Sequence, residues 1–211
     1  MLGSLSGSLG ILATTHLKAD ERALYNATDL ARLDGHEDHI CCSIEYPNAW
    51  YFDRAKDREP LFRDWVVLLI EPRYLWEDGT RFCPRNAANA FGRDVGEGID
   101  AFRALFAISV SGAYGKRYNR DPAHLPFCPT DEQAEILIPD RVPIQDLVGV
   151  VVSNESQAKN EITRLRLSGV PTSGLNFLVN PTLYEKRTLS TCIRSGTRPV
   201  EVPWDQGIAH G

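Results

Sequence analysis

The sequence lacks any long hydrophobic run, because its longest apolar stretches, such as residues 65–70, are far too short to cross a bilayer. Residues 1–4 have neither the basic start nor the apolar core of a secretory signal peptide, so we expect a cytoplasmic protein with no membrane partner. The cysteines are odd in number and have no framework spacing, which favours free thiols in a reducing compartment. They are Cys41, Cys42, Cys83, Cys128 and Cys192.

The motifs of several large enzyme classes are also missing. There is no Walker loop, no Gly-x-Gly-x-x-Gly and no Gly-x-Ser-x-Gly, which disfavours P-loop nucleotidases, Rossmann oxidoreductases and α/β-hydrolases. Four residues of the types that bind zinc, His36, His39, Cys41 and Cys42, lie close together, but without the CxxC or HxxxH spacing of zinc sites. We therefore expect no metal, and interpret Cys42 as a core residue and His39 as a strand-end residue.

Positive charge is scarce, since 23 Lys and Arg stand against 28 Asp and Glu, giving a formal net charge of −5. A protein that coats nucleic acid without sequence preference is normally basic, so any contact with nucleic acid would have to be local. The most basic segment, residues 116–120, could provide such a patch or could be a solvated loop. It belongs to a long loop predicted at 112–131, and loops of that length are usually functional or disordered.

Short apolar stretches of strand length alternate with a few helical patterns. The expected strands are 39–46, 64–71, 81–83, 136–138, 147–152, 177–179 and an edge strand within 199–204. The expected helices are 20–32, 99–110 and 156–168, and 54–59 is expected to be a charged loop or helical turn. This mixture favours a monomer with one α+β domain over 1–211, in which 1–10 are flexible and 170–211 are a C-terminal extension of the same domain.

Polar side chains stand at the ends of three expected strands. They are Asn48 and Tyr51 after the first, Arg85 and Asn86 after the third, and Glu135 at the start of the fourth. Taken singly, each could be a surface or capping residue. Glu135 could be an edge charge that prevents its strand from pairing with other chains, or a carboxylate held rigidly over a cleft.

Three segments, 39–52, 82–88 and 133–139, resemble in order and spacing the DarT toxins. These are ADP-ribosyltransferases of bacterial toxin–antitoxin systems that modify bases in single-stranded DNA. The similarity covers residues 10–168 and implies a split mixed or antiparallel β-sheet core with flanking helices. The run from Tyr46 to Phe52, Tyr-Pro-Asn-x-Trp-Tyr-Phe, resembles the guanine-directed branch, because the thymine-directed branch usually carries arginine at the position of Asn48.

The resemblance implies an NAD-dependent mono-ADP-ribosyltransferase toxin that modifies a base, guanine by the branch it resembles, in single-stranded DNA. NAD would be the ADP-ribose donor, and the partners would be single-stranded DNA and a DarG-like macrodomain antitoxin. Glu135 would be the one catalytic glutamate. By the same resemblance the other site residues fall into two groups: NAD would be bound by Asn48, Tyr51, Ser43 and Arg85, and the DNA by Tyr118, Arg120 and Asn86.

One departure from the family pattern leaves a second hypothesis open. Family members normally begin with a strand that carries a His-Phe-Thr-like motif for NAD, which this sequence does not show. Residues 9–12 could be what remains of the element after that strand, and His16 could be a substitute for the motif. The alternatives are therefore a non-catalytic relative that acts as a binding or interaction module, and a transferase that acts on RNA.

Overall fold

The computed structural model describes residues 33–58, 64–89, 91–112, 115–169, 172 and 174–205, and the backbone of two short strands at 2–3 and 16–18. The predicted helix at 20–32 and most of the predicted flexible segment at 1–10 lie outside the described residues. None of the helices in the described part of the chain is long and apolar enough to span a membrane.

A five-stranded sheet is built around the two most apolar strands of the sequence. Its order is β1 (Leu2–Gly3), β4 (Val66–Ile70), β11 (Leu147–Val152), β12 (Phe177–Val179) and β13 (Val202–Pro203). Strands β4 and β11 are antiparallel, whereas β11 and β12 are parallel and are joined through helix α4 (Glu155–Leu167). Both central strands are continuously apolar because side chains on both of their faces are buried.

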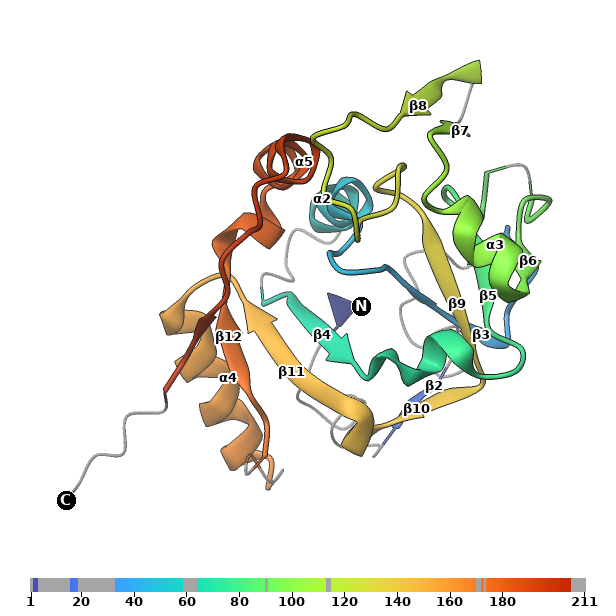
Figure 1. Cartoon of the computed structure of the whole chain (residues 1–211). Helices are drawn as coiled ribbons and strands as arrows, with labels where there is room; N and C mark the ends of the chain where they lie inside the picture. Colours follow the sequence, from blue (N-terminus) through green and yellow to red (C-terminus); the bar gives the residue numbers. More distant parts are fainter. Residues whose placement is uncertain are drawn as a thin grey trace.

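A four-stranded antiparallel sheet forms the other half of the molecule, on the right in Figure 1. Its order is β3 (His39–Cys42), β9 (Glu135–Pro139), β5 (Arg81–Cys83) and β6 (Gly96–Glu97). Two smaller ladders complete the strands: β10 (Arg141–Pro143) pairs with β2 (His16–Lys18), and β7 (Ser109–Ser111) with β8 (Arg117–Asn119). These mixed and antiparallel sheets with flanking helices confirm the α+β class predicted from the sequence.

Two helices depart from the prediction. Helix α2 (Ala49–Arg58) is longer than the charged loop or helical turn expected at 54–59, because Ala49, Phe52 and Ala55 recur at helical spacing and are buried. Helix α3 (Gly98–Ala104) is shorter than predicted. The predicted continuation of this helix to residue 110 is instead a turn followed by β7, and Ile108 is 81% exposed.

A further helix of the described chain, α5 (Lys186–Ser195), lies in the predicted C-terminal extension, where the sequence predicted no helix. It buries Leu189, Ser190 and Ile193 and ends at Gly196, whose φ of 74° is the left-handed conformation that glycine adopts most easily. A side chain on Gly196 would also approach the carbonyl oxygen of Ala123 to 2.5 Å. Within the described residues, short 3-10 helices connect other elements: η1 (Pro72–Trp76), η3 (Ile144–Asp146) and η4 (Pro181–Tyr184).

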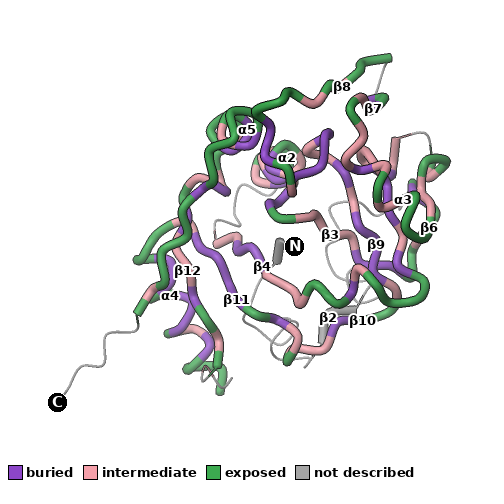
Figure 2. Tube along the Cα trace, viewed as in Figure 1, coloured by how far each residue is buried: buried purple, intermediate pink, exposed green. Residues whose placement is uncertain are grey.

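The core is divided by the alternation of side chains along β4 and β11. Val66, Val150 and Val152 join a cluster that also holds Ile136 of β9 and the buried face of α4. The intervening positions, such as Val151, face a second cluster formed with α5 and the segment after β3. Figure 2 shows β11 almost entirely buried, whereas β6 and β8 lie at the exposed margin.

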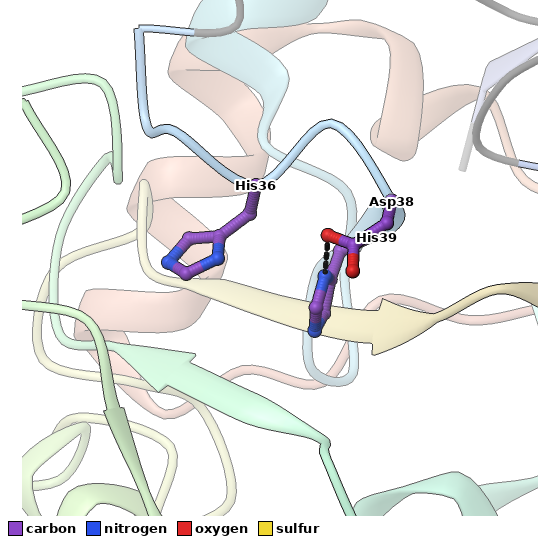
Figure 3. A group of neighbouring side chains, drawn as sticks. All are labelled: His36, Asp38 and His39. Carbon is purple, nitrogen blue, oxygen red and sulfur yellow. Dashed lines mark hydrogen bonds and ion pairs between the residues drawn. The ribbon is translucent and has the colours of Figure 1, made fainter.

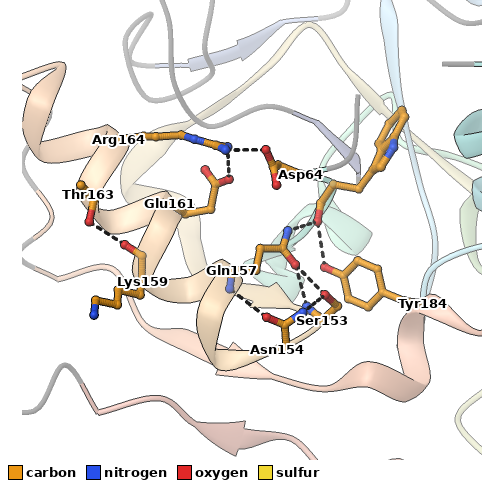
Figure 4. A network of polar contacts seen from close by, with 10 residues as sticks. Asp64, Ser153, Asn154, Gln157, Lys159, Glu161, Thr163, Arg164 and Tyr184 are labelled. Atoms are coloured by element: carbon orange, nitrogen blue, oxygen red, sulfur yellow. Dashed lines mark hydrogen bonds and ion pairs between the residues drawn. The ribbon is translucent and has the colours of Figure 1, made fainter. Parts of the chain in front are cut away.

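Helix α4 is attached to the first sheet by polar as well as apolar contacts (Figure 4). Asn154 caps the helix by accepting from the Gln157 amide (2.9 Å), and the Gln157 side chain donates to the Trp65 carbonyl (2.6 Å). The Tyr184 hydroxyl is also 3.2 Å from that carbonyl and 2.8 Å from the carbonyl of Val151. These bonds satisfy buried backbone groups next to β4 and fix the helix in register.

Candidate active site

The Glu135 carboxylate lies at the first position of β9, opposite Cys83 of β5, and is half-buried. One of its oxygens accepts from the Asn86 side-chain amide at 2.7 Å, and the other accepts from the Ala87 backbone amide at 3.2 Å. Both donors belong to the loop that follows β5. The structure thus brings together two residues predicted from the sequence, Glu135 and Asn86, and holds the carboxylate in one orientation.

Arg85 stabilises that loop from within. Its guanidinium binds Asp94 through two nitrogens and donates to the Gly112 carbonyl at 3.2 Å. The visible role of Arg85 is therefore to anchor residues 84–94 against the end of β7. The NAD contact predicted for Arg85 stays a prediction, and it would require the guanidinium to act from this ion pair.

Ser43, Asn48 and Tyr51 also come together, at the start of α2. The Asn48 amide donates to the Ser43 hydroxyl at 3.2 Å, and the Asn48 side-chain oxygen accepts from the Tyr51 amide at 3.0 Å. This is the geometry of a helix N-cap, so Asn48 has a structural role whether or not it contacts NAD. Ser43 in addition lines a small pocket beside the first turn of the helix.

That pocket lies between the end of β3 and the turn before β9. It is lined by Ser43, Ile44, Tyr46, Pro47, Cys128, Pro129, Glu132, Ala134 and Ile193. Its surroundings are largely apolar, and burial raises the pKa of the Cys128 thiol to about 12 and that of the Tyr46 hydroxyl to about 12. Raised pKa values of this kind make both groups poor nucleophiles in this environment.

Glu132 is a site residue that the sequence did not reveal. Its carboxylate is almost fully buried and accepts from Trp50 of α2 (2.9 Å) and from Ser190 and Arg194 of α5 (2.7 and 3.0 Å). It therefore ties two helices to the turn that leads into Glu135. Its partners lie 58 to 82 residues away in the sequence, so no local pattern could have indicated the cluster.

Asp131 is buried in the same turn, where one of its oxygens accepts from the Gln133 amide at 2.9 Å. Burial, reinforced by the neighbouring charge of Glu132, raises the pKa of the Asp131 carboxyl to about 6. The turn before the candidate catalytic residue thus contains one carboxylate held by donors, Glu132, and one that is protonated in mildly acidic solution, Asp131.

Two of the three residues predicted to contact DNA lie between β7 and β9: Tyr118 is in strand β8, and Arg120 follows that strand directly. The ring of Tyr118 packs over Gly112, where an added side chain would come within 2.4 Å of it. The Arg120 guanidinium donates to the carbonyls of Cys128, Leu125 and Pro126 at 2.8 to 2.9 Å. Burial lowers the pKa of Arg120. The loop is thereby folded around Arg120, and a phosphate contact by this residue stays a prediction.

The histidines and cysteines near β3 separate into two groups. Cys42 packs against the first core cluster and Cys41 against a small cluster on the other face, in agreement with the interpretation of Cys42 as a core residue. His36, Asp38 and His39 place one potential ligand atom each within 4.8 Å of one another (Figure 3). The contacts of the His39 ring and the surroundings of the His36 ring differ.

In this group, His39 Nδ1 lies 2.7 Å from Asp38 and Nε2 lies 3.1 Å from the Gly79 carbonyl. These contacts join the start of β3 to the turn before β5. Burial lowers the pKa of His36, and the nearby Arg81 acts in the same direction. The expectation that this protein binds no metal stays a prediction.

Comparison with known proteins gives three results. A family model described as "DarT: ssDNA thymidine ADP-ribosyltransferase, DarT" matches residues 20–184. A search of curated proteins finds no match. Among solved structures, the chain is similar to Thermus sp. 2.9 DarT in complex with carba-NAD+, with a TM-score of 0.55 and 12% identity over 87% of this chain and 95% of that chain.

The same Thermus protein is also matched in two other states. Its complex with ADP-ribosylated ssDNA gives a TM-score of 0.54 and 14% identity over 87% of this chain and 94% of that one. Its complex with NAD+ gives a TM-score of 0.52 and 12% identity over 87% of this chain and 95% of that one. At these identities the structural likeness concerns the fold.

Proposed function

Because this chain belongs to the DarT family and is an NAD-dependent ADP-ribosyltransferase, we propose that it transfers ADP-ribose to a base of single-stranded DNA with Glu135 as the catalytic residue. The observation that carries the assignment is the position of this carboxylate. It stands at the head of a central strand, with one donor on each oxygen, both from the adjoining loop. Such preorganisation suits a group that must face a charge developing in the transition state.

Glu135 would act in two ways. Breaking the bond between nicotinamide and the ribose C1′ leaves positive charge on the sugar, as in glycoside hydrolysis, and a fixed carboxylate stabilises that charge through space. A nitrogen of the base then bonds to C1′ and loses a proton, which the same carboxylate accepts. Nicotinamide leaves with the electron pair of the broken bond, so no further reactant is required.

We assign NAD to the region where Ser43, Asn48 and Tyr51 meet. Their proximity at the start of α2 supports the assignment, as does the pocket that Ser43 shares with Glu132 and Ala134, directly before Glu135. The printed ligands of the similar Thermus protein, NAD+ and carba-NAD+, are of the same chemical class. Asn86, which touches Glu135, would lie where donor and acceptor meet.

For the acceptor base we propose guanine. The support is the Tyr-Pro-Asn-x-Trp-Tyr-Phe run from Tyr46 to Phe52, in which Asn48 replaces the arginine usual in the thymine-directed branch. The description of the matching family model names thymidine, so the decisive experiment compares guanine with thymine as the acceptor base. A guanine acceptor would lose a proton from a ring or exocyclic nitrogen to Glu135.

Mass spectrometry of oligonucleotides incubated with the protein and NAD tests this proposal. We expect the mass of one ADP-ribose to be added to single-stranded DNA whose only reactive base is guanine, and not to a matched thymine oligonucleotide. Glu135→Gln should abolish the addition, whereas Glu155→Gln, on the exposed start of α4, should leave it unchanged. Addition to the thymine DNA alone would overturn the guanine assignment, and addition to RNA alone would overturn the DNA assignment.

We further propose that the protein acts as a monomeric toxin in the cytoplasm and is countered by a macrodomain antitoxin that removes ADP-ribose from DNA. The five free cysteines support a reducing compartment. Expression of the wild-type chain should arrest growth, and co-expression of an active macrodomain hydrolase should restore it. Growth arrest by Glu135→Gln as strong as that by the wild type would contradict toxicity through base modification.

A further inference from the structure

Two aromatic side chains stand far out in solvent in the described part of the chain. Phe91 is 75% exposed and Trp76 is 74% exposed. Single exposed aromatics are common and need no functional explanation. Phe91 differs from Trp76 in its backbone, because its φ is 55°, in the left-handed region that is rare and costly for a bulky residue.

The loop around Phe91 is fixed in this conformation by its own hydrogen bonds. The Phe91 amide donates to the Ala88 carbonyl at 3.3 Å, and the Gly92 amide donates to the Ala87 carbonyl at 3.0 Å. Gly92 packs so closely on the segment before β3 that a side chain there would lie 2.3 Å from the Asp34 carbonyl oxygen. The turn is thus closed on its inner side, and the phenyl ring is directed outward.

The same loop holds the catalytic carboxylate. Ala87 donates its amide to Glu135 and accepts with its carbonyl from Gly92, so Glu135 and the Phe91–Gly92 turn are joined through a single residue. The ion pair between Arg85 and Asp94 closes the base of the loop. The ring of Phe91 is therefore held on a rigid support that also fixes the carboxylate at the reaction centre.

We propose that Phe91 is a stacking platform for a nucleobase of the single-stranded DNA substrate, next to the base that receives ADP-ribose. This inference rests on the proposed function. Bases of any kind stack on exposed aromatic rings, and such platforms bind single strands with little sequence preference. The exposed Arg93, two residues further along the same turn, adds a positive charge to this loop, and phosphates of a bound strand are contacted by such residues.

A DNA base fits this platform better than NAD does. Small-molecule and cofactor sites are concave and bury most of the ligand surface. Phe91 is instead three-quarters exposed, in the loop that joins β5 to the edge strand β6, both labelled in Figure 1. A single strand that crosses the surface could contact it while its neighbouring base enters the site at Glu135.

Direct binding of a labelled single-stranded oligonucleotide tests the platform. In a Glu135→Gln background, which prevents turnover, Phe91→Ala should weaken binding about tenfold and Phe91→Trp should preserve it. Trp76→Ala is the matched control, because it removes an equally exposed aromatic ring from η1, and it should leave binding unchanged. Phe91→Gly should reproduce the loss of affinity with a backbone suited to positive φ, which separates loss of the ring from misfolding.

The stabilisation of the protein by NAD in a thermal-shift titration should be the same for Phe91→Ala and wild type. Unchanged oligonucleotide binding by Phe91→Ala overturns the platform while leaving the proposed function intact. Loss of NAD stabilisation in Phe91→Ala would instead place the ring on the donor and also overturn the inference. A wild-type protein that neither binds nor modifies any oligonucleotide would overturn the proposed function itself.

Discussion

The two large sheets of this protein are built on different principles. In the sheet of β4 and β11, apolar side chains are buried on both faces, and the polar groups around it, such as Gln157 and Tyr184, satisfy backbone carbonyls. In the sheet of β3, β9, β5 and β6, polar and charged residues stand at the strand ends, among them Glu135 and Asn86. Three non-glycine residues with positive φ occur in the described chain, and all lie in segments that follow strands of this second sheet: Glu45 after β3, Phe91 between β5 and β6, and Asp140 directly after β9.

This difference indicates that the first sheet is a structural scaffold, whereas the second sheet carries the candidate active site. The first sheet is stabilised by the burial of apolar side chains. The free energy of that burial is roughly proportional to the apolar area removed from water and does not depend on the orientation of any one group. The second sheet holds Glu135 in one orientation by hydrogen bonds from a loop that contains an unfavourable backbone conformation at Phe91. Strain of this kind persists only where the surrounding structure imposes it, and it concentrates at functional sites. Substitutions should therefore affect activity in one half and stability in the other.

The largest expected effect is on catalysis in the second sheet. Glu135→Gln should reduce ADP-ribose transfer about a thousandfold, because an amide of the same shape cannot stabilise the developing positive charge. Its cost in stability should be limited to about 1 kcal/mol for the altered hydrogen bond with Ala87. Initial rates with an oligonucleotide substrate, together with a thermal melt, measure both. Activity within tenfold of wild type would remove Glu135 from its catalytic role.

In the first sheet and the helix packed on it, a substitution should reduce stability and leave activity unchanged. Leu165 of α4 is fully buried, and Leu165→Ala should lower the free energy of unfolding by about 2–5 kcal/mol through lost burial and a residual cavity. Transfer per folded molecule should be unchanged. Urea denaturation gives the stability, and Leu167→Ala, at a position 84% exposed on the same helix, should change it by less than about 0.5 kcal/mol. Equal losses in both variants would show that α4 is not packed on the core as described.

A third effect concerns pH and the turn before Glu135. The Asp131 carboxyl has a native pKa of about 6, against an ordinary value of 3.8. The native state therefore retains this proton to higher pH than the unfolded chain, and stability decreases as pH rises between these two values, by about 3 kcal/mol in total. Asp131→Asn should abolish this dependence of stability on pH. The neighbouring charges of Glu132, Arg194 and Arg85 remain in the variant, so the difference from wild type reports on Asp131 alone.

Urea unfolding at pH 4, 5, 6 and 7 measures this component as the difference between the two proteins. The gain in stability of the variant relative to wild type should grow from pH 4 to pH 6 and then level off. Parallel curves for the two proteins across this range would show that Asp131 ionises in the native state as it does in the unfolded chain.

The smallest expected effect on transfer distinguishes the orientation of the Glu135 carboxylate from its charge. Asn86→Ala removes the 2.7 Å hydrogen bond to Glu135 and should lower transfer about tenfold, the effect of losing one bond to a charged group. Asn89→Ala, in the same loop, is the control and should retain full activity. Measurement of kcat and KM for both substrates is the readout, with the loss expected in kcat. A loss confined to the KM for DNA would instead favour the substrate-binding role originally predicted for Asn86.

Much of the scaffold could be predicted from the sequence. The strand at 147–152 was found at its observed bounds, and 64–71 contains the observed β4, because continuous apolar runs between turn residues have few alternatives. Helix α5 was missed because its apolar positions are few and its stability depends on packing against the second core cluster. Helix α2 was missed because an N-capping asparagine and three buried residues lie among charged side chains.

The sequence by itself determined the α+β class, the family and the location of Glu135 at the head of a strand, because apolar periodicity and short motifs are local in the chain. Only the tertiary structure decided which groups hold that carboxylate, that Arg85 and Arg120 are engaged within their own loops, and that Glu132 joins α2 and α5. The physical reason is that the contacts of Glu135 and Glu132 span 48 to 82 residues and form only when sheets and helices are packed together, whereas those of Arg85 with Asp94 and of Arg120 depend on loop conformations that packing imposes. Hydrogen-bond geometry of that kind leaves no periodic signal in the sequence.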